Sequence, residues 1–135
     1  MNAGSFGRWY VYALSAYFIL AGLGALLDVD SKLSRVGLQA QTDDGKIAFV
    51  LIYCSLMVGV GTAMLVLSWA SKGWLYSAIL VTVVVSSFVA FRVVGAIMVG
   101  HVTGVQATYL TIEVVEVLLG VSLILLSKRA APGPL

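Results

Sequence analysis

Charged side chains are scarce in this sequence: only 10% of its 135 residues are charged, and 61% are hydrophobic. A soluble domain carries about 25% charged residues, so this composition does not support a solvated globular surface. The mean hydropathy of +1.05 agrees. We predict an integral membrane protein made of one domain, residues 1–135. The formal net charge of +2 is too small to suggest a nucleic-acid partner.

Cysteine, histidine and proline are nearly absent as well. Cys54 is the only cysteine, which excludes an internal disulfide, and its apolar neighbours predict a small buried hydrophobic side chain. The only histidine is His101. Both prolines lie in the tail "APGPL", residues 131–135, where we expect no further helix.

Long apolar runs occupy most of the chain, at residues 9–27, 47–70, 74–99 and 107–126. Each is close to the roughly 20 residues that a helix needs to cross the hydrocarbon core, and none alternates as a transmembrane strand does. The first run is longer than the core of about 7–15 residues in a signal peptide, so we expect it to be retained. We therefore predict an all-α fold, an antiparallel bundle of four transmembrane helices.

The distribution of basic residues predicts the direction of this bundle. If the chain crosses four times, one side receives Arg8, Lys72, Lys128 and Arg129. The other side receives the loop 28–46, with three bases and four acids, and the uncharged loop "GHVTGVQ". The positive-inside rule then places both termini in the cytoplasm. The tryptophans fall at the same ends, where an aromatic belt is expected: Trp9, Trp69 and Trp74.

The loop 28–46 is the only sizeable polar piece between the runs. Its stretch "DSKLSRVGL" predicts either a short helix on the outer surface or a plain solvated loop. In the helical alternative, Leu33, Val36 and Leu38 would face lipid or protein.

Three ionisable residues interrupt the last two apolar runs: Arg92, Glu113 and Glu116. Counted outward from the connecting loop, near residue 103 or 104, they lie about 12, 9 and 12 residues away, hence at similar depth in the outer half of the bilayer. An antiparallel hairpin would bring them within reach of one another. One arginine can hold one carboxylate with two hydrogen bonds, which leaves the second glutamate in need of another donor, water or a proton.

The spacing of polar positions in the last run predicts that one helix face turns inward. Tyr109, Glu113, Glu116 and Gly120 follow the i, i+4, i+7, i+11 pattern of a single face. Gly95 lies three residues after Arg92 and would give room for close approach or for a side chain to cross.

Two interpretations of these charges remain open. The first is an ion pair that fixes helix register without adding net stability. The second is a polar cavity that binds or moves something, because intramembrane ionisable groups favour function. Other residues that could line the cavity are Asp28, Tyr53, Ser55, His101, Thr103 and Gln106. A metal site that uses His101, Asp28 and the glutamates lacks a recognisable ligand spacing, so we predict no metal.

Small residues recur at helical spacing in the first two runs. Ser55, Gly59 and Ala63 form one such pattern, and Ala21 and Ala25 form another. Their ordinary role is close helix contact inside a bundle, and the alternative is a face for a homodimer.

The segment "FRVVGAIMVGHVTGVQATYLTIEVVEVLLG" resembles the second half of a widespread bacterial family of four-pass membrane proteins of unknown function, which are DoxX-like in layout. Members carry an Arg in the third span, a Gly shortly after it and a Glu in the fourth, which Arg92, Gly95 or Gly100, and Glu113 or Glu116 match. The stretch "LLDVDSKLSRVGLQAQ" resembles the segment after the first span. The resemblance implies the fold and a place in the bacterial inner membrane, and it brings no activity or cofactor.

One motif of that family is altered here. Members often open the second span with Arg-Tyr-Gly-Gly, whereas this chain has "KIAFVLIYCSLMVGVG". Tyr53 matches the Tyr, Cys54 and Ser55 stand where Gly is expected, and the Arg is missing unless Lys46 replaces it. One cation is thus left for two carboxylates.

The sequence favours a small accessory or binding protein, which would hold a polar or amphipathic ligand or a partner helix against Arg92, Glu113 and Glu116. A second hypothesis is a transporter or proton-linked carrier, as a homodimer, in which Glu116 exchanges a proton. A third is a structural or immunity-type subunit of a larger membrane complex. No nucleophile–base pair, phosphate loop or metal-protease motif supports an enzyme.

Overall fold

The computed structural model describes the backbone of residues 3–130 and the side chains of residues 4–127. The tail at 131–135 and the side chains of Lys128 and Arg129 lie outside the described residues, so the expectations placed on them stay predictions. Within the described part every regular element is a helix, which confirms the all-α prediction: α1 Ala3–Leu27, α2 Val29–Arg35, α3 Asp43–Phe49, the π-helical η1 Val50–Cys54, α4 Ser55–Ala70, α5 Leu75–Val99 and α6 Gly104–Ala130.

Four helical segments are long and apolar enough to cross a membrane: Gly4–Leu27, Asp43–Ala70, Leu75–Val99 and Gly104–Ser127. The second of these is one continuous helix in which α3, η1 and α4 follow each other without a break. Large apolar side chains such as Leu20, Phe91 and Ile97 are exposed on the outer faces. An apolar surface of this extent is typical of a protein that faces lipid, and the chain is accordingly a candidate multi-pass membrane protein.

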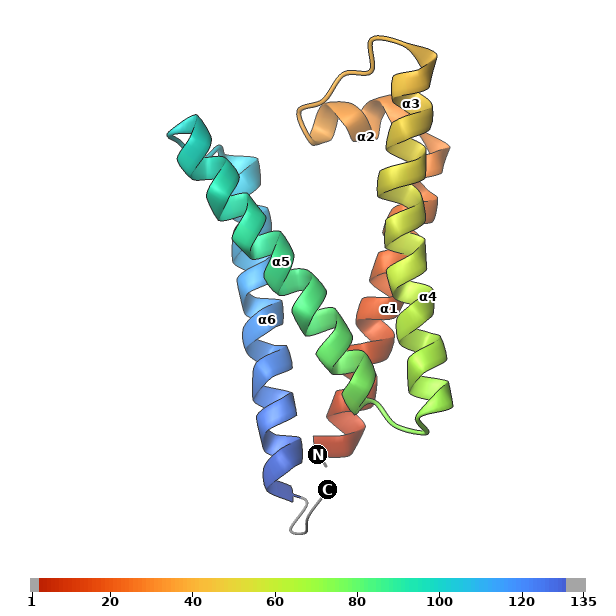
Figure 1. Cartoon of the computed structure of the whole chain (residues 1–135), viewed down its shortest axis with the longest axis vertical. Coiled ribbons are helices and arrows are strands. Elements are labelled where there is room, and N and C mark those ends of the chain that lie inside the picture. The colour runs from red at the N-terminus through yellow and green to blue at the C-terminus, as the bar shows by residue number, and fades with distance from the viewer. Residues whose placement is uncertain (1–2, 131–135) are drawn as a thin grey trace.

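The long helices form two pairs, α1 with α4 and α5 with α6 (Figure 1). The pairs meet at the end that carries the α4–α5 turn, which we call the turn end, and they diverge toward the end that carries α2, the α2 end (Figure 1). Helices α1, α4 and α5 share the main core, whose buried residues are Val11, Leu14, Phe18, Met57, Met64, Ala78, Val81 and Val85.

Side-chain hydrogen bonds tie the pairs together near the turn end. The buried Ser77 hydroxyl on α5 donates to the Met64 carbonyl oxygen on α4 at 2.7 Å. The Tyr10 hydroxyl on α1 donates to the Glu116 carbonyl oxygen on α6 at 3.0 Å. Such interhelical bonds matter in lipid, where apolar burial alone gives helices little reason to associate.

Glycines set the close approach of α1 and α4. A Cβ atom on Gly61 would lie 2.8 Å from the Ser15 carbonyl oxygen, and one on Gly22 would lie 2.8 Å from the Cys54 carbonyl oxygen. Because the obstructing atoms belong to the backbone, the helices would have to separate to accept a larger residue.

For Ser55, Gly59 and Ala63 the predicted contact inside the bundle is wrong, whereas the alternative of a homodimer face stays a prediction. All three are exposed, and a Cβ atom on Gly59 would meet nothing within 4 Å. The contact face of α4 instead carries Met57, Gly61 and Met64, because the helix is rotated relative to the expected orientation. In α1 the expected pattern does face inward, since Ala25 is fully buried and Ala21 packs against the core.

The segment after α1 contains the short helix that was one of two alternatives for the loop 28–46. Helix α2 begins at its cap Asp28, whose carboxylate accepts a hydrogen bond from the Ser31 amide at 3.0 Å. Leu33 is buried, as the helical alternative requires, whereas Leu38 lies beyond the helix and is exposed. The second membrane segment starts at Asp43 rather than at residue 47, because Thr42 caps α3.

Candidate functional site

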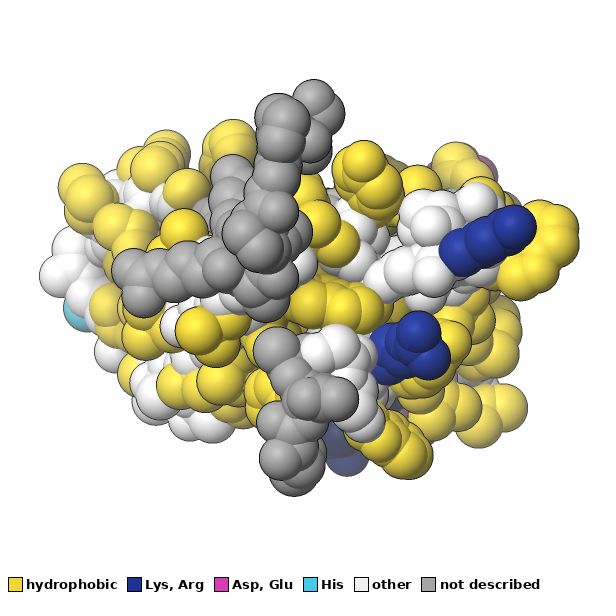
Figure 2. Space-filling view, turned by 90° about the horizontal axis from the view of Figure 1, so that it is seen from below, with side chains coloured by type: hydrophobic (Ala, Val, Ile, Leu, Met, Phe, Trp, Pro, Cys, Tyr) yellow, Lys and Arg dark blue, Asp and Glu magenta, His cyan; other side chains and the backbone are white. Residues whose placement is uncertain are grey.

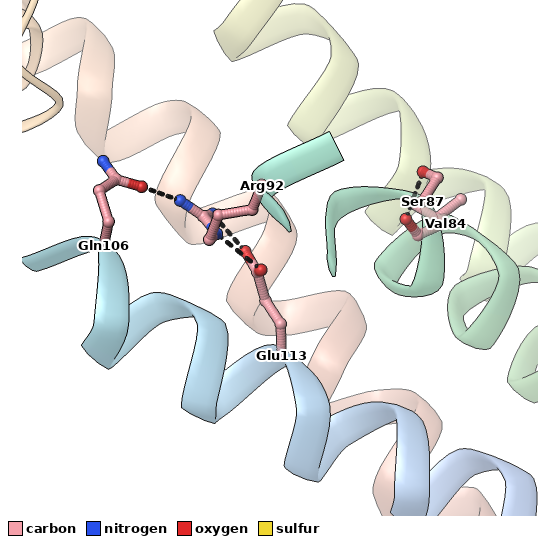
Figure 3. A network of polar contacts seen from close by, with 5 residues as sticks. All are labelled: Val84, Ser87, Arg92, Gln106 and Glu113. Carbon is pink, nitrogen blue, oxygen red and sulfur yellow. Dashed lines mark hydrogen bonds and ion pairs between the residues drawn. The ribbon is translucent and has the colours of Figure 1, made fainter. Parts of the chain in front are cut away.

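An arginine on α5 holds a glutamate on α6 with two hydrogen bonds. The Arg92 Nε donates to Glu113 Oε2 at 2.9 Å, and Nη2 lies 2.5 Å from Glu113 Oε1 (Figure 3). This planar two-point contact is the strongest geometry available to an arginine and a carboxylate. The side chains are 24% and 13% exposed, so the ion pair is partly accessible rather than fully buried.

A glutamine on the first turn of α6 completes the contacts of this guanidinium. Gln106 Oε1 accepts a hydrogen bond from Arg92 Nη1 (Figure 3). The Tyr109 ring lies below the same group, with 5.4 Å between Arg92 Cζ and the ring centroid, within the range of a cation–π contact. Gln106, Tyr109 and Glu113 therefore present three different kinds of partner to one cation from a single helix.

The predicted inward face of α6 is the face that is less exposed. Tyr109, Glu113 and Glu116 are partly buried and Gly120 is buried, whereas Val114 and Val115 between the glutamates are exposed. The face thus follows the spacing expected from the sequence.

Glu116 lies on this face without joining the Arg92 contacts. Its carbonyl oxygen accepts the Tyr10 hydrogen bond, but its carboxylate makes no hydrogen bond or ion pair within residues 4–127. A partly buried carboxylate without a donor is costly in an apolar segment. The sequence offers two carboxylates to one guanidinium. Arg92 binds Glu113, so among residues 4–127 the Glu116 carboxylate is the one without a partner.

Two further sequence candidates make their contacts with residues other than Arg92. Asp28 caps α2, a structural role. Tyr53 belongs to η1, where its ring stacks on Phe49 with centroids 5.0 Å apart. A π turn often marks a functional position in a helix, and Tyr53 lies within this one.

A metal site built from His101, Asp28 and the glutamates does not form. Among the residues whose side chains are described, no three His, Cys, Asp or Glu side chains come close enough to hold a metal ion. His101 lies instead beside the Arg92 pocket described next.

A pocket of about 320 Å³ lies beside Arg92, between the α2-end parts of α5 and α6 and their connecting loop. Polar groups meet an apolar wall in its lining, which includes Arg92, Gly95, His101, Thr103, Gln106 and Leu110. Gly95 is open: a Cβ atom there would meet nothing within 4 Å, so this glycine widens the pocket rather than allowing helices to touch. We call this space the Arg92 pocket.

Gln106 lies in a helix, whereas the sequence analysis predicts it in the loop before the last apolar run. Helix α6 begins at Gly104, and the Gln106 amide lies 3.4 Å from the capping Thr103 Oγ1. The signal was available, because Thr103 followed three residues later by Gln106 has the form of a capping box.

Comparisons with known proteins assign neither a family nor a function to this chain. No family model, curated protein or solved structure matches the chain. The resemblance to a four-pass family therefore remains an expectation from the sequence, and function has to be argued from the residues themselves.

The Arg92 pocket can recognise a hydrogen-bond acceptor. A guanidinium carries five N–H groups, and three are used by Glu113 and Gln106, which leaves one on each terminal nitrogen. Glu113 balances the positive charge of Arg92. Recognition of a ligand in the pocket therefore depends more on where the two remaining N–H groups point than on net charge.

Proposed function

We propose that this chain is a small multi-pass accessory protein of the bacterial inner membrane that holds an amphipathic molecule in the Arg92 pocket. The observation that carries the proposal is a pocket with a fixed guanidinium in its lining, inside a segment apolar enough to span a membrane. Ionisable groups are rare at such positions and favour a ligand or transport role. A pair that served register alone would need no pocket beside it.

The lining defines the class of ligand. Free N–H groups of Arg92, with His101 and Thr103 at the mouth, suit a carbonyl, ester or hydroxyl head group. The apolar wall, which includes Val99, Val102 and Leu110, suits an acyl or isoprenoid chain. A volume of about 320 Å³ fits the polar head and the first carbons of such a molecule, with the rest in lipid.

The proposed orientation places the pocket in the outer half of the bilayer. It rests on an antiparallel four-helix arrangement with cytoplasmic termini, in which Arg8 and Lys72 mark the inner side. The Arg92 pocket would then be open to molecules that arrive in the outer leaflet.

Filling the pocket tests the proposal. In Gly95→Leu the new side chain would start in open space within the pocket, whose lining does not include Glu113, so we expect bound lipid-like molecules to be lost while the fold persists. The measurement is mass spectrometry of molecules that copurify with the full chain in mild detergent. The matched control is Gly59→Leu, an equally open glycine on an exposed helix face.

The outcome is decisive in either direction. A specific molecule present with wild-type protein and Gly59→Leu but depleted at least tenfold in Gly95→Leu supports the pocket. Equal amounts in all three proteins, with unchanged thermal stability, would leave the ion pair as a register device only.

Glu116 favours a second candidate, a proton-linked carrier. Its carboxylate has no partner among the described side chains, and it lies one helical turn from the Arg92–Glu113 pair. In Glu116→Gln, which keeps the size and removes the titration, proton-coupled uptake into proteoliposomes is expected to stop while thermal stability stays near that of the wild type. Wild-type protein that moves no protons in a pH-dye assay would rule the carrier out, and stable copurification with a larger membrane protein would favour a subunit role.

A further inference from the structure

A second pocket, at the turn end, gathers two basic side chains from different elements. It measures about 670 Å³ and is lined by Arg8 of α1, by Lys72 of the α4–α5 turn, and by Tyr12, Ser68 and Trp69. Figure 2 looks onto this end of the molecule and shows Lys and Arg side chains standing among hydrophobic ones. We call this the Arg8–Lys72 pocket.

No acidic side chain among residues 4–127 pairs with the positive charges of this pocket. The ion pairs found among residues 4–127 are Lys46 with Asp30 and Arg92 with Glu113, neither of which involves Arg8 or Lys72. The sequences of α1, α4 and α5 contain no acidic residue. Two cations that face one hollow repel each other unless an anion lies between them.

The backbone at Lys72 is in a conformation that normally selects glycine. Its φ is 51°, and the surrounding hydrogen bonds form a Schellman end to α4, with the Gly73 amide donating to the Ser68 carbonyl oxygen and the Lys72 amide to the Trp69 carbonyl oxygen, each at 3.2 Å. A residue other than glycine is strained in this left-handed region, because its Cβ atom crowds the following carbonyl oxygen. The chain carries lysine at this position and glycine one residue later, so the cation stands where the turn by itself prefers no side chain.

A close contact brings Arg8 to the same place. A Cβ atom on Gly7 would collide with the Trp74 ring, so only glycine lets α1 pass this close to the start of α5. Arg8 is thereby held next to the turn that carries Lys72.

The aromatic side chains at this end identify the environment. Trp69 is 83% exposed and Tyr12 is 50% exposed, beside the two cations. Exposed Trp and Tyr at the ends of apolar helices occupy the head-group level of a bilayer. Anionic lipids carry their head-group charges at this same level.

We propose that the Arg8–Lys72 pocket binds the phosphate of an anionic phospholipid in the leaflet that faces the turn end. Arg8 and Lys72 donate hydrogen bonds and charge to the phosphate, and Tyr12 and Trp69 flank the glycerol region. This site lies at the opposite end of the spans from the Arg92 pocket and is independent of it.

Quenching of tryptophan fluorescence by brominated lipids tests the site. Trp9 lies near the start of α1, Trp69 near the end of α4 and Trp74 directly before α5, so quenching of the three tryptophans reports lipid at the turn end. The full chain is reconstituted in two lipid mixtures. One combines phosphatidylcholine with brominated phosphatidylglycerol, and the other combines brominated phosphatidylcholine with phosphatidylglycerol. Each basic residue near a bilayer surface contributes about a fivefold preference for anionic lipid, so Lys72→Gly and Arg8→Gln should each lower the preference about fivefold.

Controls separate this site from general charge effects. Lys72→Gly keeps or raises thermal stability, because glycine suits the left-handed turn, and a lost preference then cannot come from unfolding. Arg35→Gln removes one exposed charge at the α2 end and should leave the preference unchanged. Preference kept in both Lys72→Gly and Arg8→Gln, or lost equally in Arg35→Gln, overturns the proposal. Displacement of brominated phosphatidylglycerol by excess inorganic phosphate would overturn the lipid as the source of the phosphate.

Discussion

Arg92→Met is expected to lower the free energy of unfolding by about 2 kcal/mol or more. Removing one member of a buried ion pair costs about 3–5 kcal/mol, and partial exposure of this pair reduces that figure. The loss arises because Glu113 keeps its place in an apolar segment after its two hydrogen bonds have gone. The thermal unfolding midpoint in detergent micelles, compared with Arg35→Met at an exposed site, measures the effect.

Removing both charges should restore most of that stability. In Arg92→Met combined with Glu113→Leu, no unpaired carboxylate is left, and apolar replacement of such pairs is often neutral or stabilising. A double-mutant cycle with Arg92→Met, Glu113→Leu and the double variant gives the coupling energy. If the double variant is as unstable as the sum of the two single variants, the pair does not contribute to stability in the way described here.

The approximate meeting of Arg92 with a glutamate was predictable, but the choice of glutamate was not. Counting from the loop placed both glutamates at similar depth on one helix face, with Glu116, about 12 residues out like Arg92, nearer to the level of the arginine than Glu113 at about 9. The choice follows from side-chain geometry, since Glu113 accepts from two nitrogens while Gln106 takes the third. Gln106 became available because the Thr103 side chain caps α6, which therefore starts earlier than the apolar run does.

The four helical segments were predictable because length and apolarity are strong signals of a membrane span. Their starts were less so: Thr42 and Thr103 begin helices in polar sequence that a hydropathy pattern does not mark. The orientation of each helix about its axis was the least predictable feature. The sequence pattern pointed to Gly59, yet Gly61 is the glycine that contacts α1, because lipid-facing and protein-facing residues are equally apolar.

Gly120→Ala is the second change with a large expected effect, a loss of about 1–3 kcal/mol from overpacking. A Cβ atom at Gly120 would collide with Thr82 Oγ1 of α5 and would lie 2.8 Å from the Tyr10 hydroxyl oxygen of α1. Neither atom moves freely: Thr82 donates to the Ala78 carbonyl oxygen at 2.7 Å, and Tyr10 donates to the Glu116 carbonyl oxygen. The thermal midpoint in detergent should therefore fall.

The sign of the effect distinguishes contact from helix propensity. Alanine is favoured over glycine within a helix by about 1 kcal/mol, so the open control Gly59→Ala should be as stable as the wild type or more so. Adding Thr82→Ala to Gly120→Ala removes the nearest obstructing atom and should recover part of the loss. Gly120→Ala as stable as Gly59→Ala would show that α6 does not pack against α1 and α5 at this point. Because Tyr10 and Thr82 come from different helix pairs, this glycine is one of the places where the two pairs are joined, and its substitution should loosen α6 and with it the placement of Glu113 beside Arg92.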